Sequence, residues 1–216
     1  MKIFVFFLFY INTFALSIID KPIIFDKERI ELSKLYIQKH YDLKVDTITI
    51  QPRMLVIHWT AINDFTRSYM RFHETRLPLD RPDISKASAL NVSTHFMIDR
   101  DGKIYRLMDE TKMARHVIGL NYYAIGIENV GGENNLDNLT PAQLQANIKL
   151  IKYLTRKYAD LTYMIGHHEY TQCENTPLWL ETDKNYKTVK YDPGKDFIQK
   201  LRLQFPELKS CSKVKN

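Results

Sequence analysis

The sequence predicts a single α/β domain, in which a central mixed β-sheet is flanked by helices. Three observations lead to this prediction. Short apolar runs alternate along the chain with segments whose apolar residues recur at spacings of three and four, which is the pattern of strands alternating with helices. The 216 residues, 44% of them hydrophobic, are enough for one core. The sequence has no internal repeat and no sign of a second core.

Residues 1–17 have the pattern of a secretory signal peptide. Lys2 precedes an apolar stretch that ends at Leu16, and the small residues around Ser17 suit a signal peptidase. The stretch is shorter than the roughly 20 apolar residues of a spanning helix. We therefore expect an exported protein, periplasmic or secreted, without a stable membrane span. An uncleaved anchoring segment is the alternative.

Residues 18–50 are expected to add a helix and a strand before the main domain. In the segment from Asp26 to Tyr41, residues Leu32, Leu35 and Tyr36 share one face at helical spacing. Residues 45–50 alternate between polar and apolar side chains, as in a half-buried strand.

The predicted main domain, residues 51–205, begins with the continuous apolar run of residues 54–57, which is typical of a buried strand. Residues 62–76 are expected to be helical. The stretch of residues 78–91 contains prolines and serines and is expected to be an irregular loop.

Two further strands, residues 95–99 and 103–108, are expected to form a hairpin, because Asp101-Gly102 between them is a strong turn signal. Residues 124–130 are expected to form another buried strand, which ends at Gly131-Gly132.

The last part of the main domain is expected to contain two helices and a strand. Thr140 is suited to cap the first helix, with Pro141 at its first position. Residues 163–165 are expected to form a short strand, and a last helix is expected to end at about Phe205. Residues 206–216 would form a C-terminal tail.

The composition limits the classes of partner. The chain has 31 Lys and Arg residues against 25 Asp and Glu residues, and its net charge of +6 favours a polyanion such as nucleic acid, anionic lipid or an acidic cell-wall polymer. No basic cluster is interleaved with aromatic residues, so we do not expect nucleic-acid binding. The two cysteines exclude a cysteine-rich scaffold. After export, Cys173 and Cys211 would form either one disulfide to the tail or two free thiols.

Polar side chains lie in or directly after the apolar runs, where α/β enzymes build their sites. His58 follows the first run, Glu128 lies within Ala-Ile-Gly-Ile-Glu-Asn-Val, and His167 follows Tyr-Met-Ile-Gly. Asp192 begins Asp-Pro-Gly, two positions after Lys190. Each has an ordinary structural interpretation by itself. Glu128 is the hardest to explain in this way, because a buried carboxylate without a partner is destabilising.

Together these residues suit the hydrolysis of an amide. Two histidines and an aspartate are ligands that suit Zn²⁺, which lowers the pKa of a bound water towards about 7. Glu128 would accept the proton of that water and pass it to the leaving amine, and Lys190 would stabilise an oxyanion. The sequence has no His-Glu-x-x-His, Gly-x-Ser-x-Gly or P-loop motif.

The chain resembles the zinc-dependent N-acetylmuramoyl-L-alanine amidases, a family that shares its fold with peptidoglycan recognition proteins. The resemblance rests on five motifs in the family's order: LVIHWTA, NVSTHFMIDRDGKIYRL, ARHVIGLNYYAIGIENVGG, MIGHHEY and KYDPGKDF. It extends from about Met54 to Phe197. It implies hydrolysis of the amide bond between N-acetylmuramic acid and L-alanine in peptidoglycan or muropeptides, which releases the stem peptide.

The resemblance also implies a role for each residue of the site. His58, His167 and Asp192 would bind Zn²⁺, with His168 as the alternative to His167. Glu128 would be the catalytic acid and base, and Lys190 would assist at the oxyanion. The residues expected to line the substrate groove are Trp59, Thr60, Arg115 and His116.

Two features depart from the family pattern. Arg115 stands where the family often has tryptophan, and His167 and Asp192 are 25 positions apart, more than in members with a short loop. His95 matches a family position behind the site and is expected to be structural.

Two alternatives to this function remain. A recognition module would bind peptidoglycan without cutting it, but such members lose a metal ligand, whereas all three ligands are present here together with Glu128 and Lys190. A related amidase would act on soluble muropeptide fragments instead of the polymer. In either case the partner is peptidoglycan or a muropeptide, and the chain is expected to be a monomer.

Overall fold

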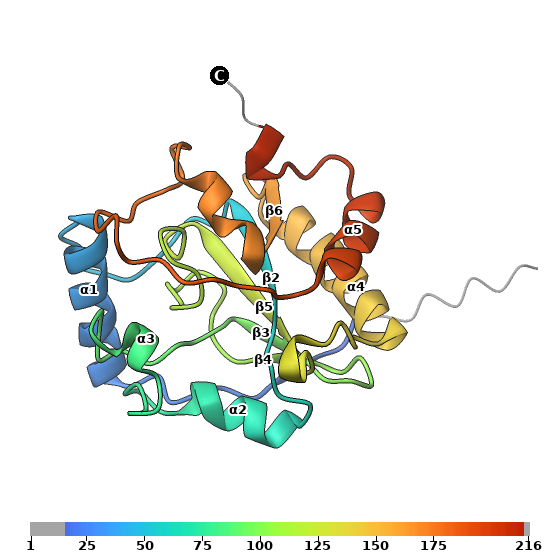
Figure 1. The fold of residues 1–216 in the computed structure, drawn as a ribbon, viewed down its shortest axis with the longest axis horizontal. Helices are drawn as coiled ribbons and strands as arrows, with labels where there is room; N and C mark the ends of the chain where they lie inside the picture. Colours follow the sequence, from blue (N-terminus) through green and yellow to red (C-terminus); the bar gives the residue numbers. More distant parts are fainter. Residues whose placement is uncertain (1–15, 214–216) are drawn as a thin grey trace, which may run out of the picture.

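A six-stranded sheet runs through the centre of the computed structural model, which describes residues 16–213 (Figure 1). The strand order is β1-β4-β3-β5-β2-β6, and each neighbouring pair is parallel except β3 with β4. The strands are β1 (Ile18–Asp20), β2 (Met54–Trp59), β3 (Phe96–Ile98), β4 (Ile104–Arg106), β5 (Ala124–Asn129) and β6 (Tyr163–Gly166). The mixed sheet and the hairpin are therefore confirmed.

Helices lie on both sides of the sheet. Helices α4 (Pro141–Lys157) and α5 (Lys195–Gln204) pack together against one face. Helices α1 (Lys27–Tyr41), α2 (Phe65–His73) and α3 (Pro82–Ser85) lie on the other side of the molecule (Figure 1). The predicted start of α4 is confirmed, because the Thr140 side chain accepts a hydrogen bond from the Gln143 backbone N–H and Pro141 lies in the first turn. This arrangement confirms the predicted α/β class.

The alternation of side chains along β2 determines where a site can form. Leu55 and Ile57 pack in the hydrophobic cluster under α4 and α5, whereas Met54 and Val56 belong to a second cluster. Successive side chains of a strand point to opposite faces. His58 therefore lies on the face of the sheet that α4 and α5 do not cover.

Helix α1 (Lys27–Tyr41) differs from the prediction in the face that it buries. Tyr36 is buried as expected, but Leu35 is 59% exposed, so the predicted apolar face is wrong at that residue. Arg29 is buried instead, at 1% exposure. Its guanidinium donates to carbonyl groups at the end of α2 (Phe65–His73), which have no partner within that helix; these belong to Phe72, His73 and Glu74.

The predicted strand at residues 45–50 is wrong. Ile48 and Ile50 are buried, but the segment runs beside a loop and not beside a strand. The Ile50 N–H donates to the Thr111 carbonyl at 2.8 Å, and the Met113 N–H donates to the Ile48 carbonyl at 2.8 Å. Two hydrogen bonds to a loop leave the segment extended without making it part of the sheet.

Three other segments differ in detail. Helix α2 is shorter than the predicted residues 62–76, and residues 78–91 contain the short helix α3 (Pro82–Ser85) within the predicted loop. Strand β1, which the sequence did not suggest, lies beside β4 at the edge of the sheet. The predicted signal peptide lies outside the described residues except for Leu16 and Ser17. No helix in residues 16–213 has the length and apolar character needed to cross a membrane.

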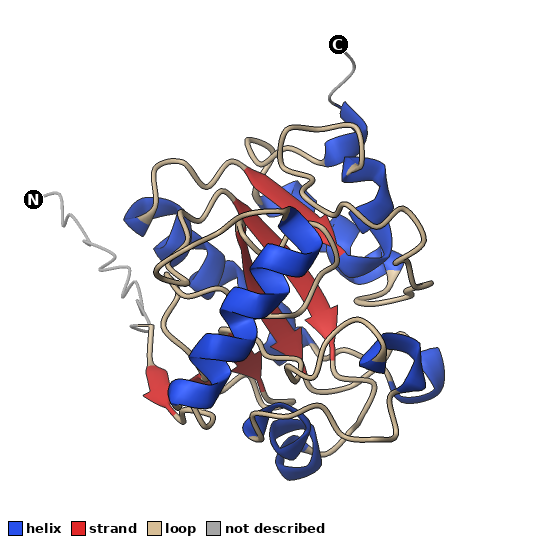
Figure 2. Cartoon of the chain, turned by 90° about the vertical axis from the view of Figure 1, so that its left-hand side faces the viewer, coloured by secondary structure: helices blue, strands red, loops and turns tan. Residues whose placement is uncertain are grey.

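Cys173 and Cys211 form a disulfide bond, so of the two alternatives, a disulfide or two free thiols, the structure contains the disulfide. It joins the end of the 3₁₀ helix η2 (His167–Cys173) to the C-terminal tail. The long loop after η2 turns towards α1, where the His40 Nδ1 lies 3.0 Å from the Glu181 carboxylate and both side chains are buried. Figure 2 shows α1 in front of the sheet from this side. The loop and the N-terminal helix thus support each other.

Candidate metal centre and active site

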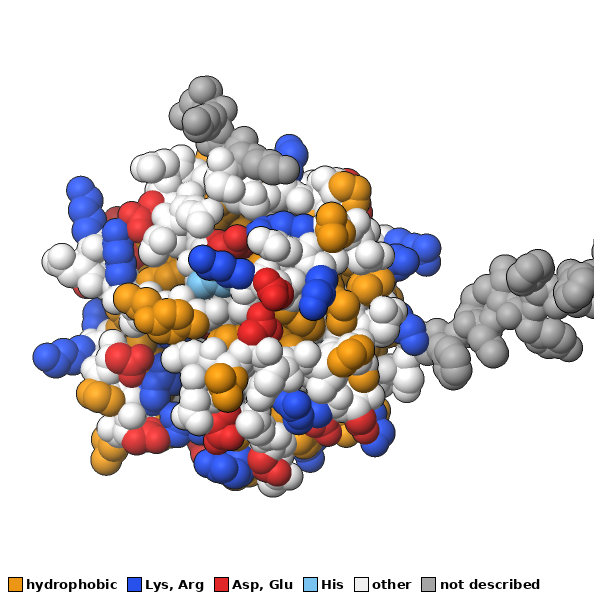
Figure 3. Space-filling view, turned by 45° about the vertical axis from the view of Figure 1, so that its right-hand side comes forward, with side chains coloured by type: hydrophobic (Ala, Val, Ile, Leu, Met, Phe, Trp, Pro, Cys, Tyr) orange, Lys and Arg blue, Asp and Glu red, His pale blue; other side chains and the backbone are white. Residues whose placement is uncertain are grey.

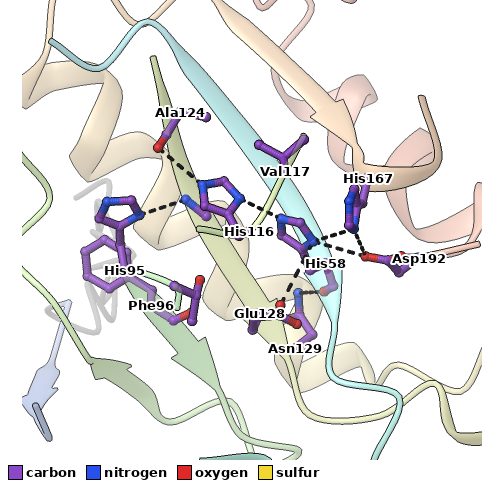
Figure 4. Close-up of polar contacts among 12 residues, drawn as sticks. His58, His95, Phe96, His116, Val117, Ala124, Glu128, Asn129, His167 and Asp192 are labelled. Carbon is purple, nitrogen blue, oxygen red and sulfur yellow. Dashed lines mark hydrogen bonds and ion pairs between the residues drawn. The ribbon is translucent and has the colours of Figure 1, made fainter. Parts of the chain in front are cut away.

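The ends of three neighbouring parallel strands bring the predicted residues together. His58 in β2 pairs directly with Glu128 in β5, and His167 follows the last residue of β6 on the other side of β2. Since parallel strands end at the same edge of a sheet, the three side chains meet there. Asp192 reaches this edge from the loop before α5 (Figure 4).

Three buried side chains place one ligand atom each at a common point. The His58 Nδ1 lies 3.0 Å from the His167 Nδ1 and 3.1 Å from the Asp192 Oδ2, and the His167 Nδ1 lies 2.9 Å from the same oxygen. His168, the alternative ligand, points elsewhere, because its Nδ1 lies 2.8 Å from the Asp192 backbone carbonyl. Of the two adjacent histidines, His167 is therefore the one that joins His58 and Asp192. We call these three residues the metal cluster.

The protonation states of the cluster suit a divalent metal. Burial lowers the pKa of His167 to about 4, although the Asp192 carboxylate opposes this, and so leaves the ring neutral at pH 7. Burial also acts to raise the pKa of Asp192, but His167 and His58 outweigh it and hold this pKa well below its usual range. Two imidazoles and one carboxylate are a ligand set typical of Zn²⁺.

His116 determines which nitrogen of His58 is free. Burial, with smaller contributions from His58 and His95, lowers the pKa of His116 far enough to keep it neutral. Its Nε2 lies 3.3 Å from the Ala124 carbonyl, which can only accept, so this nitrogen carries the proton. The His116 Nδ1 then accepts from the His58 Nε2 at 3.0 Å. The lone pair of the His58 Nδ1 therefore faces His167 and Asp192.

His95 and Gly126 support His116 from behind. His95 is fully buried, accepts a hydrogen bond from the Gly126 N–H at 3.0 Å and donates to the Lys112 carbonyl at 2.9 Å. Burial lowers the pKa of His95 to about 4. A Cβ on Gly126 would lie 2.9 Å from the His116 ring, so only glycine leaves space for that ring. These contacts agree with a structural role for His95.

Glu128 is a buried carboxyl beside the metal cluster. Its Oε1 lies 4.0 Å from the His58 Nδ1, and its Oε2 has no hydrogen-bond partner among the described residues. Burial raises the pKa of Glu128 well above its usual value, and the nearby Asp192 carboxylate adds to this. Lys190 and Arg81 act in the opposite direction. A carboxyl whose pKa is raised towards neutral pH is suited to both accept and donate a proton.

The cluster opens into a cavity of about 420 Å³. His58, Glu128, His167 and Asp192 line it, and Lys190 does so from the loop two residues before Asp192. Figure 3 shows one face of the molecule, on which a histidine is visible next to a basic side chain and several hydrophobic ones. The cavity gives a substrate access to all the polar groups of the cluster.

The four residues expected to contact substrate have different surroundings. Trp59, Thr60 and His116 line the cavity. Thr60 also closes a turn, since its hydroxyl donates to the Ile62 carbonyl at 2.8 Å. Arg115 does not line this cavity; it is 3% exposed, and its guanidinium donates to backbone carbonyls that include Ile84 at 3.0 Å.

Sequence reasoning missed several residues of the cavity wall. Arg71 comes from α2 and Arg81 from the start of α3, while Val189 and Tyr191 flank Lys190 and are 78% and 60% exposed. None of these residues lies at the end of an apolar run. The one feature of the sequence that could have indicated these residues is the pair of apolar side chains, Val189 and Tyr191, on either side of Lys190.

Two histidines and an aspartate form a buried cluster that is compatible with a metal ion, and a protonatable glutamate lies at the same strand ends. This combination is typical of a metal-dependent hydrolase. The model of the N-acetylmuramoyl-L-alanine amidase family, Amidase_2, matches residues 49–195, which is more than half of the chain. The chain therefore belongs to this family.

Curated relatives agree with this membership. The endolysin of Escherichia phage T7 is 38% identical over 84 residues, which are 37% of this chain and 55% of the endolysin. The endolysin of Enterobacteria phage K11 is 32% identical over 101 residues, 43% of this chain and 66% of that protein. The chain spans about half the length of the first of these curated relatives.

Human PGRP-IBETAC, whose structure was solved in complex with glycosamyl muramyl pentapeptide, is 17% identical to this chain. The likeness covers 75% of this chain and 88% of the human one, with a TM-score of 0.50. It shows a shared fold.

Proposed function

We propose that this protein is a zinc-dependent amidase, which hydrolyses the bond between N-acetylmuramic acid and L-alanine in peptidoglycan or muropeptides. The observation that carries the proposal is the juxtaposition of His58, His167 and Asp192 with the buried Glu128. Membership of the amidase family supports the same bond as the substrate.

The residues that would hold Zn²⁺ are His58, His167 and Asp192. When bound there, Zn²⁺ supplies a Lewis acid that polarises the scissile carbonyl and activates water at neutral pH. His116 holds the His58 ring in the orientation that ligation needs, through the 3.0 Å hydrogen bond to its Nε2. The chain thus supplies both the ligands and the group that orients one of them.

Glu128 is the proposed acid and base. In its ionised form, the Glu128 carboxylate, whose Oε1 lies 4.0 Å from the His58 Nδ1, would take a proton from the attacking water and give it to the nitrogen of the leaving L-alanine. Lys190 lines the same cavity and would place a positive charge near the carbonyl oxygen as that oxygen becomes negative. These two side chains separate the proposed amidase from a module that only binds its ligand.

The site of action is proposed to be outside the cytoplasm. The signal pattern at residues 1–17 supports export, and the disulfide between Cys173 and Cys211 is of the kind that persists in oxidising compartments. N-terminal sequencing of the exported protein is expected to begin near Ile18. An intact Met1 on the exported protein would indicate an anchoring segment instead. Light scattering of the same preparation is expected to show a monomer.

The deciding experiment is digestion of purified peptidoglycan, with and without a zinc chelator, followed by mass spectrometry. Free stem peptides that start at L-alanine, and that disappear with chelator and return with added Zn²⁺, are the expected products. Shortened peptides would identify an endopeptidase. Retained binding without products would identify a recognition module. Parallel digestion of soluble muropeptides distinguishes an amidase of the polymer from one of its fragments.

A further inference from the structure

A second cavity, of about 570 Å³, adjoins the one over the metal cluster. The two cavities share Thr60, Ala61, Arg71 and Arg81, so they form one continuous groove. The remaining residues of the second cavity are Ile62, Thr66, Arg67 and Met70. Its lining therefore contains three arginines and no acidic side chain.

The three arginines keep donors available for a ligand. Arg67 and Arg71 are one turn apart on α2 and so lie on the same side of that helix. Arg71 uses its Nη1 on Asp80 at 2.7 Å, and a guanidinium has five N–H donors. Within residues 16–213, the Arg67 guanidinium has no hydrogen-bond or ion-pair partner.

Arg81 connects the second cavity to the catalytic groups. Its Nε and Nη2 each lie 3.1 Å from an oxygen of Asp83, which leaves its Nη1 free. Arg81 lines both cavities, and the first of them is also lined by His58, Glu128, His167 and Asp192. One extended ligand can therefore contact Arg81 and these residues at the same time.

We propose that Arg67, Arg71 and Arg81 form a carboxylate-binding subsite for the peptide portion of the substrate. This inference rests on the proposed amidase function. The carboxyl of the muramic acid is consumed in the scissile amide, so the negative charge near that bond lies on the peptide. The subsite thus determines the orientation in which the substrate lies in the groove. The peptide extends over α2, and the sugar lies on the side of Val189 and Tyr191, which line only the first cavity.

The test compares two muramoyl-L-alanyl peptides, one with free carboxylates after the L-alanine and one with the same carboxylates amidated. The wild-type protein is expected to prefer the acidic peptide by about tenfold in kcat/KM, since hydrogen bonds between charged groups are roughly twice as strong as neutral ones. Arg67→Gln is the cleanest variant, because its guanidinium has no structural partner in the described part of the chain. It is expected to raise KM for the acidic peptide alone and to leave kcat unchanged.

Arg156→Gln is the matched control, because Arg156 is exposed on α4 and lines neither of these cavities. It is expected to keep the wild-type preference. Equal effects of Arg67→Gln on the acidic and amidated peptides, or no wild-type preference, would overturn the subsite while leaving the amidase intact. If neither peptide is hydrolysed, the proposed function fails instead. Calorimetric binding of the acidic peptide to wild-type protein and Arg67→Gln then still decides the subsite, which predicts weaker binding by the variant.

Discussion

The Nε2 of His58 lies 3.0 Å from the Nδ1 of His116, while the other nitrogen of the His58 ring faces His167 and Asp192. His116 in turn contacts the Ala124 carbonyl (Figure 4). Its ring packs directly over Gly126, where a Cβ would lie 2.9 Å from it. The metal cluster is therefore oriented by a residue that contributes no ligand atom.

Replacing His116 tests this orientation. We expect His116→Phe to weaken Zn²⁺ binding by about 10–100-fold, because it removes the acceptor for the His58 Nε2–H. His116→Asn is expected to retain most of the affinity, since its Oδ1 can occupy the place of the lost Nδ1. Competition with a chromophoric chelator measures both. Equal affinities of the two variants would contradict the role of the hydrogen bond.

Glu128→Gln is expected to keep Zn²⁺ and to lose hydrolysis by about 10²–10⁴-fold, because the amide side chain cannot transfer the proton. Elemental analysis and turnover are measured on the same preparation. Unchanged turnover would remove Glu128 from the mechanism, whereas loss of metal would show that its role is in binding.

The adjacent histidines provide a matched test of the ligands. His167→Ala is expected to abolish stoichiometric Zn²⁺, while His168→Ala is expected to retain it, because only His167 lies in the cluster. His58→Ala and Asp192→Ala should behave as His167→Ala does. Full zinc occupancy in His167→Ala, measured by elemental analysis, would refute the assignment.

The stability of the metal-free protein is expected to depend on pH through His95. Its pKa is about 4 in the folded protein, against an unfolded value of about 6.5, so the unfolded chain binds more protons between these values. Stability therefore falls as the pH is lowered from 6.5 to 4, by about 3 kcal/mol from this residue. Urea unfolding of wild type and His95→Asn across this range measures the difference. Parallel curves would show that His95 does not contribute.

Removing the disulfide is expected to lower the free energy of unfolding. Cys173 and Cys211 are 38 positions apart, and closing a loop of that length stabilises a fold by about 4 kcal/mol in the chain-entropy estimate. Urea unfolding of the Cys173→Ser, Cys211→Ser double variant, compared with reduced and oxidised wild type, measures this. Identical midpoints for all three would show that the bridge does not stabilise the fold.

The sequence predicted the central strands, because short continuous apolar runs such as residues 54–57 are typical of buried strands. It also predicted that His58 and Glu128 lie in or directly after such strands, and the structure pairs the two residues directly in β2 and β5. These features depend on local pattern, which a sequence displays directly.

Other features depend on contacts between distant segments. Residues 45–50 alternate like a strand, but no strand lies beside them. Leu35 has the right spacing for burial, yet α1 turns Arg29 inward because the end of α2 supplies acceptors for its guanidinium. Arg81 lines the groove from a short helix within a segment that lacks any apolar periodicity. Only the assembled fold reveals these partners.

Gly126 has a consequence for how natural variation in this protein is interpreted. It has no side-chain functional group, lies within β5 and does not line the cavity, so nothing about the residue itself suggests a role in the site. Yet a single methyl group at this position would lie 2.9 Å from the His116 ring and from the Thr94 hydroxyl. An alanine there would force the His116 ring to shift away from His58, so we expect it to weaken the proposed metal site although all three proposed ligands remain.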